Sequence, residues 1–194
     1  VGVLEALLET FPLARRIELS AAATHGEPPS SRARRPHRVG VVTTTGGGAA
    51  MVVDQLGIRD VQVQPPSKAT MERLRQAGID VAPGRVLDLT LAGTRYEVMK
   101  PVLDILLQAP EFDLVLAVVG SSARFQPQLA VRPIIDSIDQ AKPLAAMLVP
   151  DAPQALAELT QAGVPCFRSP EACADAIAAV FARRGSALST HCLL

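Results

Sequence analysis

Short apolar runs alternate with helix-like segments between residues 38 and 183. The clearest run, residues 114–119, is apolar at every position, which is typical of a strand buried on both faces of a parallel sheet. The predicted strands cover residues 39–44, 86–89, 113–119, 144–149 and 164–167, with residues 61–64 as a short edge strand. Strands that alternate with helices in this way predict an α/β domain.

The segments between these strands predict helices, several of which have recognisable ends. The predicted helices cover residues 47–56, 67–77, 94–108, 128–138, 151–163 and 169–183. Ser169 and Pro170 are typical of the N-cap and first residue of a helix, and Gly78 is typical of the position just after a helix. Residues 94–97 (TRYE) resemble a capping box, and Asp151 is predicted to cap the helix that follows it.

This order of elements predicts a flavodoxin-like doubly wound fold with a mainly parallel five-stranded sheet and helices on both faces. Numbered along the chain, the five main strands are expected in the order 2-1-3-4-5. We expect this domain to span residues 38–184. Residues 1–37 are predicted to form a helical segment interrupted at Pro12 and a linker rich in Pro, Ser and Arg, and residues 185–194 a flexible tail.

Composition narrows the classes of function. The 194-residue chain is 48% hydrophobic, which is enough for one packed domain, and its 19 basic residues balance its 19 acidic ones. Balanced charge and only 3% aromatic residues argue against nucleic-acid binding, and no apolar run approaches the ~20 residues that span a membrane. Three cysteines without metal-ligand spacing favour a reducing cytoplasm. The missing initiator Met indicates a piece of a longer chain.

The expected strand order places a candidate site where the order reverses, beyond the carboxyl ends of the first and third strands. Two loops should meet there, residues 43–48 (TTTGGG) and residues 120–124 (GSSAR). Convergence of these two loops is the central prediction about function.

The first loop leads directly into an apolar helix. We expect Thr44, Thr45, Gly46, Gly47 and Gly48 to bind a phosphate or carboxylate with hydroxyl groups and the amides at the positive end of that helix. The alternative is a tight turn that needs glycine only for close packing. The loop is neither a Walker motif, since no Lys follows, nor a dinucleotide fingerprint, since the glycine spacing differs.

The second loop offers hydroxyl groups and a guanidinium. Gly120, Ser121, Ser122 and Arg124 are candidates for binding an acyl carboxylate, although Arg124 could equally be an exposed loop residue. Asp88 ends the second strand at the same edge. It is a further candidate for this site, with a local hydrogen-bond acceptor as the alternative.

Few side chains in the predicted domain are suited to acid–base catalysis. All three histidines, His25, His37 and His191, lie outside residues 38–183, so a hydrolase triad is not expected there. Cys166 and Cys173 are predicted to be packing residues, and no cluster of metal ligands is apparent. We therefore predict no catalytic or metal-binding residue in this chain.

Residues 39–57 (VGVVTTTGGGAAMVVDQLG) resemble the strand, glycine-rich turn and helix that open the ligase domain of nucleoside-diphosphate-forming acyl-CoA synthetases. They are also similar to the carboxyl-terminal domain of the succinyl-CoA synthetase β subunit. The resemblance continues through residues 86–89 (VLDL) and 94–119 and ends at residues 161–171 (QAGVPCFRSPE). It covers about 145 residues, and it lies in the ordered set of motifs rather than in one of them.

The resemblance implies one domain of a multi-domain ligase that makes acyl-CoA from a carboxylic acid, CoA and ATP through a phosphohistidine. It implies phosphate contacts at residues 44–48 and carboxylate contacts at residues 120–124. This domain alone would bind no cofactor, while the complete enzyme would use CoA, ATP and Mg. The implied partners are the CoA-binding, phosphohistidine and ATP-grasp domains or subunits and a small carboxylic acid, and a second copy of the chain is a further candidate.

The sequence departs from the family in three places. Many relatives have Asn-Pro shortly before the aspartate that matches Asp88, where this chain has Gly84 and Arg85, and residues 121–124 replace the glycine pair of succinyl-CoA synthetases. The segment around His25 only superficially resembles the phosphohistidine motif, because it lies in the predicted linker. The alternative function is a non-catalytic module that binds or senses an acyl metabolite. A true flavodoxin or a receiver domain is disfavoured, since rim aromatics and an acidic pair after the first strand are lacking.

Overall fold

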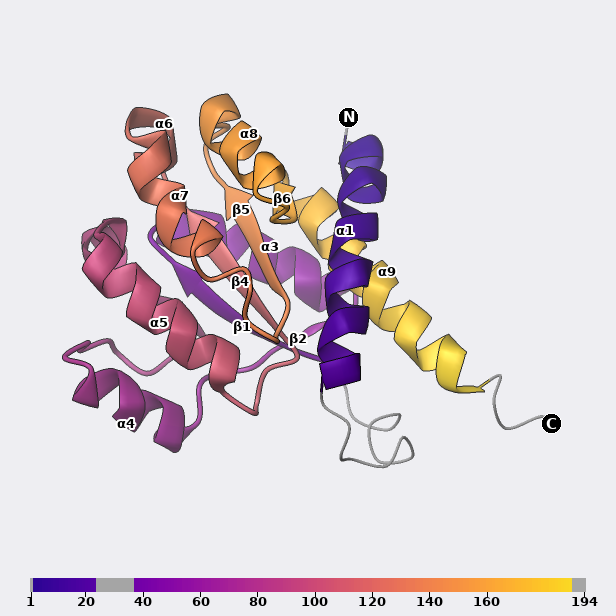
Figure 1. Ribbon diagram of the computed structural model, residues 1–194, viewed down its shortest axis with the longest axis horizontal. Coiled ribbons are helices and arrows are strands. Elements are labelled where there is room, and N and C mark those ends of the chain that lie inside the picture. Colours follow the sequence, from indigo (N-terminus) through magenta and orange to yellow (C-terminus); the bar gives the residue numbers. More distant parts are fainter. Residues whose placement is uncertain (1, 24–36, 190–194) are drawn as a thin grey trace.

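A parallel β-sheet forms the centre of the computed structural model, which describes residues 2–23 and 37–189 (Figure 1). The strands of this sheet are β1 (Arg38–Thr43), β2 (Gln62–Val63), β3 (Val86–Asp88), β4 (Leu114–Val119), β5 (Leu144–Leu148) and β6 (Cys166–Phe167). Every strand pair is parallel, as the apolar runs predicted.

The strand order reverses at β1, as predicted. The sheet runs β2-β1-β4-β5-β6, and β3 pairs with β1 as well. Because β4 occupies one edge of β1, β2 and β3 share the other: β2 pairs with Arg38 and Val39, and β3 pairs with the segment from Val41 to Thr43. The sheet is thus five strands wide, in the predicted order 2-1-3-4-5, with β2 as the predicted short edge strand.

Helices cover both faces of the sheet (Figure 1). One face is covered by α4 (Lys68–Gln76), α5 (Tyr96–Gln108), α6 (Ser122–Phe125), α7 (Pro127–Ile135) and α8 (Pro153–Gln161). The other face is covered by α1 (Gly2–Ala23), α3 (Gly46–Ile58) and α9 (Pro170–Ser189). Among the described residues, no helix combines the length and apolar character needed to cross a membrane. The flavodoxin-like fold class is confirmed.

The central strand β4 shows why the sequence selects this layering. Its side chains are all buried and alternate between the two cores: Leu114, Leu116 and Val118 pack on the side of α3 and α9, and the residues between them pack on the side of α5 and α8. Each buried apolar side chain of this size contributes about 1.5–3 kcal/mol relative to an exposed one. A polar residue anywhere in β4 would therefore be buried against one core or the other.

Some predicted helix ends are confirmed and others are wrong. Ser169 caps α9 by accepting a hydrogen bond from the amide of Ala172 (3.1 Å), and Gly78 follows α4 with a φ of +76°. The capping box is wrong, because the Thr94 hydroxyl donates to the carbonyl of Leu91 within a 3₁₀ helix, η1 (Thr90–Thr94). Asp151 does not cap α8, whose N-cap residue is Ala152.

The ends of the chain also differ from the prediction. Helix α1 continues through Pro12 to Ala23, and α9 continues to Ser189 rather than ending near residue 183. The last three residues of the expected loop at residues 120–124 belong to the short helix α6. Residues 24–36, which include His25, and residues 190–194, which include His191, lie outside the described residues.

Helix α1 packs against α9 and covers the free edge of β6. Glu9 accepts a hydrogen bond from the amide of Cys166 (3.0 Å), and Glu5 accepts one from the amide of Arg168 (2.5 Å). One turn of helix separates these two carboxylates, so they meet two alternate amides, one in β6 and one in the residue that follows it. Unpaired edge amides are templates for pairing with another chain, and α1 removes that template.

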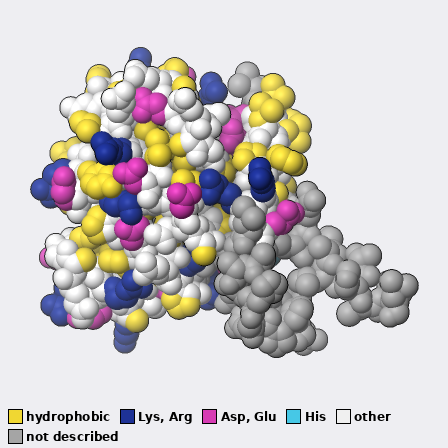
Figure 2. Space-filling model, viewed as in Figure 1, with side chains coloured by type: hydrophobic (Ala, Val, Ile, Leu, Met, Phe, Trp, Pro, Cys, Tyr) yellow, Lys and Arg dark blue, Asp and Glu magenta, His cyan; other side chains and the backbone are white. Residues whose placement is uncertain are grey.

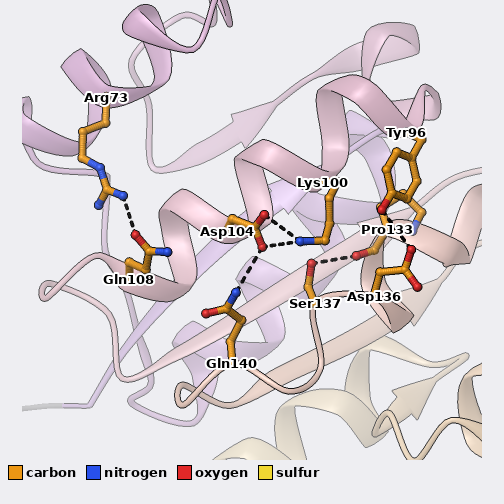
Figure 3. Close-up of polar contacts among 9 residues, drawn as sticks. All are labelled: Arg73, Tyr96, Lys100, Asp104, Gln108, Pro133, Asp136, Ser137 and Gln140. Atoms are coloured by element: carbon orange, nitrogen blue, oxygen red, sulfur yellow. Dashed lines mark hydrogen bonds and ion pairs between the residues drawn. The ribbon is translucent and has the colours of Figure 1, made fainter.

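Polar contacts join the helices that cover the opposite face (Figure 3). The Tyr96 hydroxyl at the start of α5 donates to Asp136 just after α7 (2.9 Å), and Gln140 donates to Asp104 in α5 (3.3 Å). At the other end of α5, Arg73 of α4 donates to Gln108 (2.6 Å). These contacts join α5 to α4 on one side and to the segment that follows α7 on the other.

Lys142 is held against the amino-terminal end of the sheet. Its ammonium group donates to the carbonyls of Leu106 and Ala109 and lies 5.8 Å from the centre of the Phe112 ring. Burial lowers the pKa of Lys142 to about 8, although the nearby carboxylates of Glu111 and Asp113 oppose this shift. The folded chain therefore disfavours the charged form of this side chain.

This pKa predicts a specific pH dependence of stability. Between about pH 8 and pH 10.5 the unfolded chain keeps a proton on Lys142 that the folded chain has lost, so the free energy of unfolding should rise with pH across this window. Replacing Lys142 with Met (Lys142→Met) should reduce that rise, as measured by urea unfolding at a series of pH values. The control is Lys68→Met at the exposed start of α4, which should keep the wild-type slope. Equal slopes in all three proteins would contradict the prediction.

Candidate functional site

The two loops predicted to converge do meet at the carboxyl ends of β1 and β4. The amide of Gly120 donates to the hydroxyl oxygen of Thr44 (2.9 Å), and the amide of Thr44 donates to the carbonyl of Val118 (3.0 Å). A parallel pairing of β1 with β4 puts both strand ends at one edge of the sheet, and these bonds join the loops that leave it.

Thr43 fixes the shape of the first loop. Its buried hydroxyl accepts a hydrogen bond from the amide of Thr45 (2.9 Å) and lies within donating distance of the carbonyls of Thr45 (2.9 Å) and Val118 (3.1 Å). Thr43 was not among the predicted site residues. A polar residue at the end of an otherwise apolar strand was the available signal, because a buried hydroxyl needs hydrogen-bond partners.

The glycines of the two loops serve different purposes. A Cβ atom on Gly48 would lie 2.9 Å from Cγ2 of Thr45, and one on Gly120 would lie 3.0 Å from Cβ of Thr45, so these two glycines allow close packing. A Cβ atom on Gly47 would meet nothing within 4 Å, and Gly46 and Gly47 are exposed. Close packing therefore accounts for Gly48 and Gly120 but leaves Gly46 and Gly47 facing solvent.

The exposed glycines form the first turn of α3. The helix begins at Gly46, and the carbonyl of the N-cap residue Thr45 accepts its first intrahelical bond from the amide of Ala49 (3.1 Å). The amides of Gly46, Gly47 and Gly48 precede that bond and have no acceptor within the helix, and the Thr45 side chain does not cap them. The exposed turn thus offers N–H donors at the positive end of a 13-residue helix.

Asp88 brings a negative charge to the same helix end. One of its carboxylate oxygens, Oδ2, lies 3.3 Å from the position that a Cβ atom of Gly46 would occupy. The other, Oδ1, accepts a hydrogen bond from the amide of Thr90 (2.9 Å). A carboxylate here interacts favourably with the helix dipole, and it opposes the binding of a second anion.

The remaining predicted residues begin α6. Ser121 is exposed and precedes this helix, and its carbonyl accepts a hydrogen bond from the amide of Arg124 (2.9 Å). Ser122 is its first residue, and the exposed Arg124 side chain makes no ion pair with another described residue. Of the second loop, Gly120 is the residue that the structure joins to the first loop. Ser121, Ser122 and Arg124 follow it along the same rim.

Helix η1 forms a third side of the site. A Cβ atom on Gly93 would lie 2.8 Å from Cγ2 of Thr44, so this glycine lets η1 approach the first loop closely. Leu91 in η1 and Phe125 in α6 are exposed large apolar side chains on the segments that follow β3 and β4. Neither Gly93 nor the exposed apolar side chains on these segments were predicted, because no local motif marks them.

The reactive side chains predicted to be structural lie in the core. Cys166 and Cys173 are buried, and burial raises the pKa of both thiols, that of Cys166 to about 11, so neither supplies a thiolate near neutral pH. His37 stacks on the Phe181 ring with centroids 4.3 Å apart. Within residues 2–23 and 37–189, no three side chains of the metal-ligating types are grouped together.

The sequence matches no protein-family model and no curated protein, whereas the fold is similar to known structures. The similar structures include the Pyrococcus horikoshii protein PH0766, with a TM-score of 0.68 and 23% identity over 79% of this chain. They also include dinucleotide-forming acetyl-coenzyme A synthetase 1 of Candidatus Korarchaeum cryptofilum, with a TM-score of 0.67. Its complex with phosphate and ADP is 18% identical over 81% of this chain, and its apo form 19% over 82%.

This chain spans little more than a third of each similar structure, 37% of PH0766 and 35% to 36% of the synthetase chains. At these identities the likeness shows the shared fold. It extends over most of the described domain, and the similar synthetase chains contain much more polypeptide than this one.

The contact between the loops predicts contrasting effects for two glycine substitutions. Gly120→Ala should lower the free energy of unfolding by about 1–3 kcal/mol, because the new methyl group would clash with Thr45. Gly47→Ala should raise it by up to about 1 kcal/mol, because the position is helical and open. Urea unfolding measures both values, and equal effects would show that the loops are not in close contact.

Proposed function

We propose that this chain is the ligase domain of a multi-domain NDP-forming acyl-CoA synthetase and that it supplies contacts to phosphate and to the acyl carboxylate. The complete reaction would convert a carboxylic acid, CoA and ATP to acyl-CoA, ADP and phosphate. A histidine elsewhere in the enzyme would carry the phosphoryl group from ATP to the acid. CoA would then displace phosphate from the acyl phosphate. A cytoplasmic location is part of this proposal, and the three cysteines without metal-ligand spacing favour it.

The single observation that carries the proposal is the junction of two loops at the exposed N-terminus of α3. It supports anion binding because Gly46 and Gly47 offer uncapped amides to solvent, while Gly48 and Gly120 hold the loops together. The likeness of fold to an acetyl-coenzyme A synthetase solved with phosphate and ADP agrees with this assignment. The resemblance of residues 39–57 to the ligase domain supports it independently.

In this proposal the first loop contacts phosphate. The donors are the amides of Gly46, Gly47 and Gly48 and the hydroxyl of Thr45, whose side chain does not cap α3. The Thr44 hydroxyl oxygen already accepts a bond from Gly120, so Thr44 shapes the loop and can add its hydroxyl proton. A phosphate at this position would gain from the helix dipole without needing a lysine.

The acyl carboxylate would lie beside the second loop. Gly120, Ser121 and Ser122 line the path from β4, and Arg124 is free to form a two-bond contact with a carboxylate. Asp88 carries the same charge as these ligands. Its role in the proposal is to accept a hydrogen bond from a neutral part of the substrate or of another domain.

The remaining components would come from other domains or subunits. The proposal assigns CoA binding, the phosphohistidine and the ATP-grasp site with its Mg to them. When bound there, ATP and Mg supply the phosphoryl group and neutralise its charge. The exposed Leu91 and Phe125 on the rim would bind such a domain over the loops and exclude water from the reacting groups.

A non-catalytic module that binds an acyl metabolite remains the second candidate. The position of Asp88 favours it, since a carboxylate beside Gly46 weakens the site for a highly charged phosphoryl group. This candidate predicts that a carboxylic acid binds at Arg124 while phosphate does not bind at α3.

The proposal predicts phosphate binding at the first turn of α3. Titration with inorganic phosphate should shift the backbone amide NMR signals of Gly46 and Gly47 but leave that of Gly57, near the other end of this helix, unchanged. Asp88→Asn should tighten phosphate binding about fivefold, because it removes an electrostatic repulsion of about 1 kcal/mol between the carboxylate and the phosphate.

The control for that variant is Asp54→Asn, which makes the same change of net charge at an exposed position of α3. It should leave phosphate affinity within a factor of two, as screening weakens distant charges. Absence of any shift at Gly46 and Gly47, or equal effects of the two variants, would contradict a phosphate site here.

A further prediction concerns catalysis. The 194-residue chain incubated with carboxylic acids, CoA, ATP and Mg should form no acyl-CoA, because the proposal assigns the phosphoryl carrier to another domain. Consumption of free CoA thiol measures the reaction, and an active acyl-CoA synthetase in the same mixture serves as the positive control. Formation of acyl-CoA above background by this chain would contradict the assignment of the phosphoryl carrier to another domain.

A further inference from the structure

Helix α1 has two apolar faces, and the protein itself covers one of them. The inner face packs against α9 through Ala6, Leu13, Ala14 and Ile17. The side chains of the outer face are 62% to 75% exposed and belong to Val3, Leu4, Leu7, Leu8 and Phe11. Figure 2 shows the apolar side chains gathered along the N-terminal half of this helix. We call these five residues the outer stripe.

The outer stripe carries no charge. The acidic residues in this part of α1 are Glu5 and Glu9, and both carboxylates turn toward β6, where they accept amide hydrogen bonds. An uncharged apolar surface can meet an identical surface without like-charge repulsion. A contact of this kind between two copies buries the same residues on both.

The stripe exposes on the order of 600 Å² of apolar surface, as large as the largest patches of typical monomers. Two copies joined through it would bury at most about 1,200 Å², which is the lower limit of stable protein–protein interfaces. The area therefore fits a modest homodimer.

A cleft beside the stripe offers a place for a protruding side chain. It has a volume of about 190 Å³, and its apolar side consists of Leu4, Leu8 and Leu156 of α8. Its polar side consists of Glu5, Glu9 and Thr160, with Cys166 beside them. Apolar cavities of about 150 Å³ accept a benzene ring. Arg168 also lines the cleft and can lie against the face of an aromatic ring.

Phe11 is the complementary protrusion. Its side chain is 74% exposed, and it lies one to two helical turns along α1 from Leu8 and Leu4. If two α1 helices lie antiparallel across a twofold axis between Leu7 and Leu8, Phe11 of each copy faces Leu4 of the other. Each ring would then reach the other copy's cleft.

We propose that the chain forms a homodimer through the outer stripe, with Phe11 of each copy inserted into the cleft between α1 and α8 of the other. This arrangement buries the whole stripe and fills both clefts with one reciprocal contact. A dimer in which other surfaces meet would leave Phe11 exposed.

The experiment measures the molar mass of the chain by sedimentation equilibrium over a range of concentrations. Wild type should be a dimer at micromolar concentration. Phe11→Glu should abolish dimerisation, and Phe11→Ala should raise the dissociation constant at least tenfold, since each dimer loses the two aromatic rings that fill the clefts. The matched control is Ile58→Glu, which puts the same charge on a comparably exposed apolar residue at the end of α3 and should leave the dimer intact.

Circular dichroism should show unchanged helix content in every variant, because the substituted side chains are exposed. A wild-type monomer at 100 micromolar would overturn the proposal and leave the stripe to another protein or domain. A dimer that survives Phe11→Glu, or one that Ile58→Glu disrupts equally, would also overturn it. The phosphate titration at α3 is independent of this result, so failure of one proposal does not imply failure of the other.

Discussion

The hydrogen bond from the Gly120 amide to the Thr44 hydroxyl joins the two halves of the candidate site. It exists because β1 and β4 are parallel neighbours in the sheet and end at the same level. The buried Thr43 hydroxyl and the close contacts of Gly48 and Gly120 with Thr45 leave the loops little freedom to separate. Backbone packing thus sets the position of the exposed first turn of α3.

Much of this arrangement could be predicted from the sequence. The apolar run at residues 114–119 is typical of a strand covered on both faces, and parallel strands of this kind are usually covered by helices on both sides. Strand order follows from that pattern together with the fold class. Since the carboxyl ends of neighbouring strands share one edge, the meeting of residues 44–48 with Gly120 was predictable. The binding roles of Ser121, Ser122 and Arg124 stay predictions.

The features that escaped prediction depend on contacts between residues distant in sequence. Glu5 and Glu9 look like ordinary solvated charges in α1, and only the fold brings them to β6. The approach of Asp88 to Gly46 likewise depends on how β3 lies against β1. The failed capping box at Thr94 has a local cause, because the hydroxyl bonds within η1 instead. Pro12 is tolerated inside α1, where the prediction expected an interruption.

The position of α1 against β6 has a consequence for how this fold can be moved between proteins. A copy of the domain that starts at residue 38 would keep the sheet and both loops but would lose the carboxylates that occupy the amides of Cys166 and Arg168. A gene fusion that transfers residues 38–189 alone would therefore leave an unpaired sheet edge that can associate with another chain. Helix α1 protects this edge of the sheet and therefore has to be transferred together with the domain.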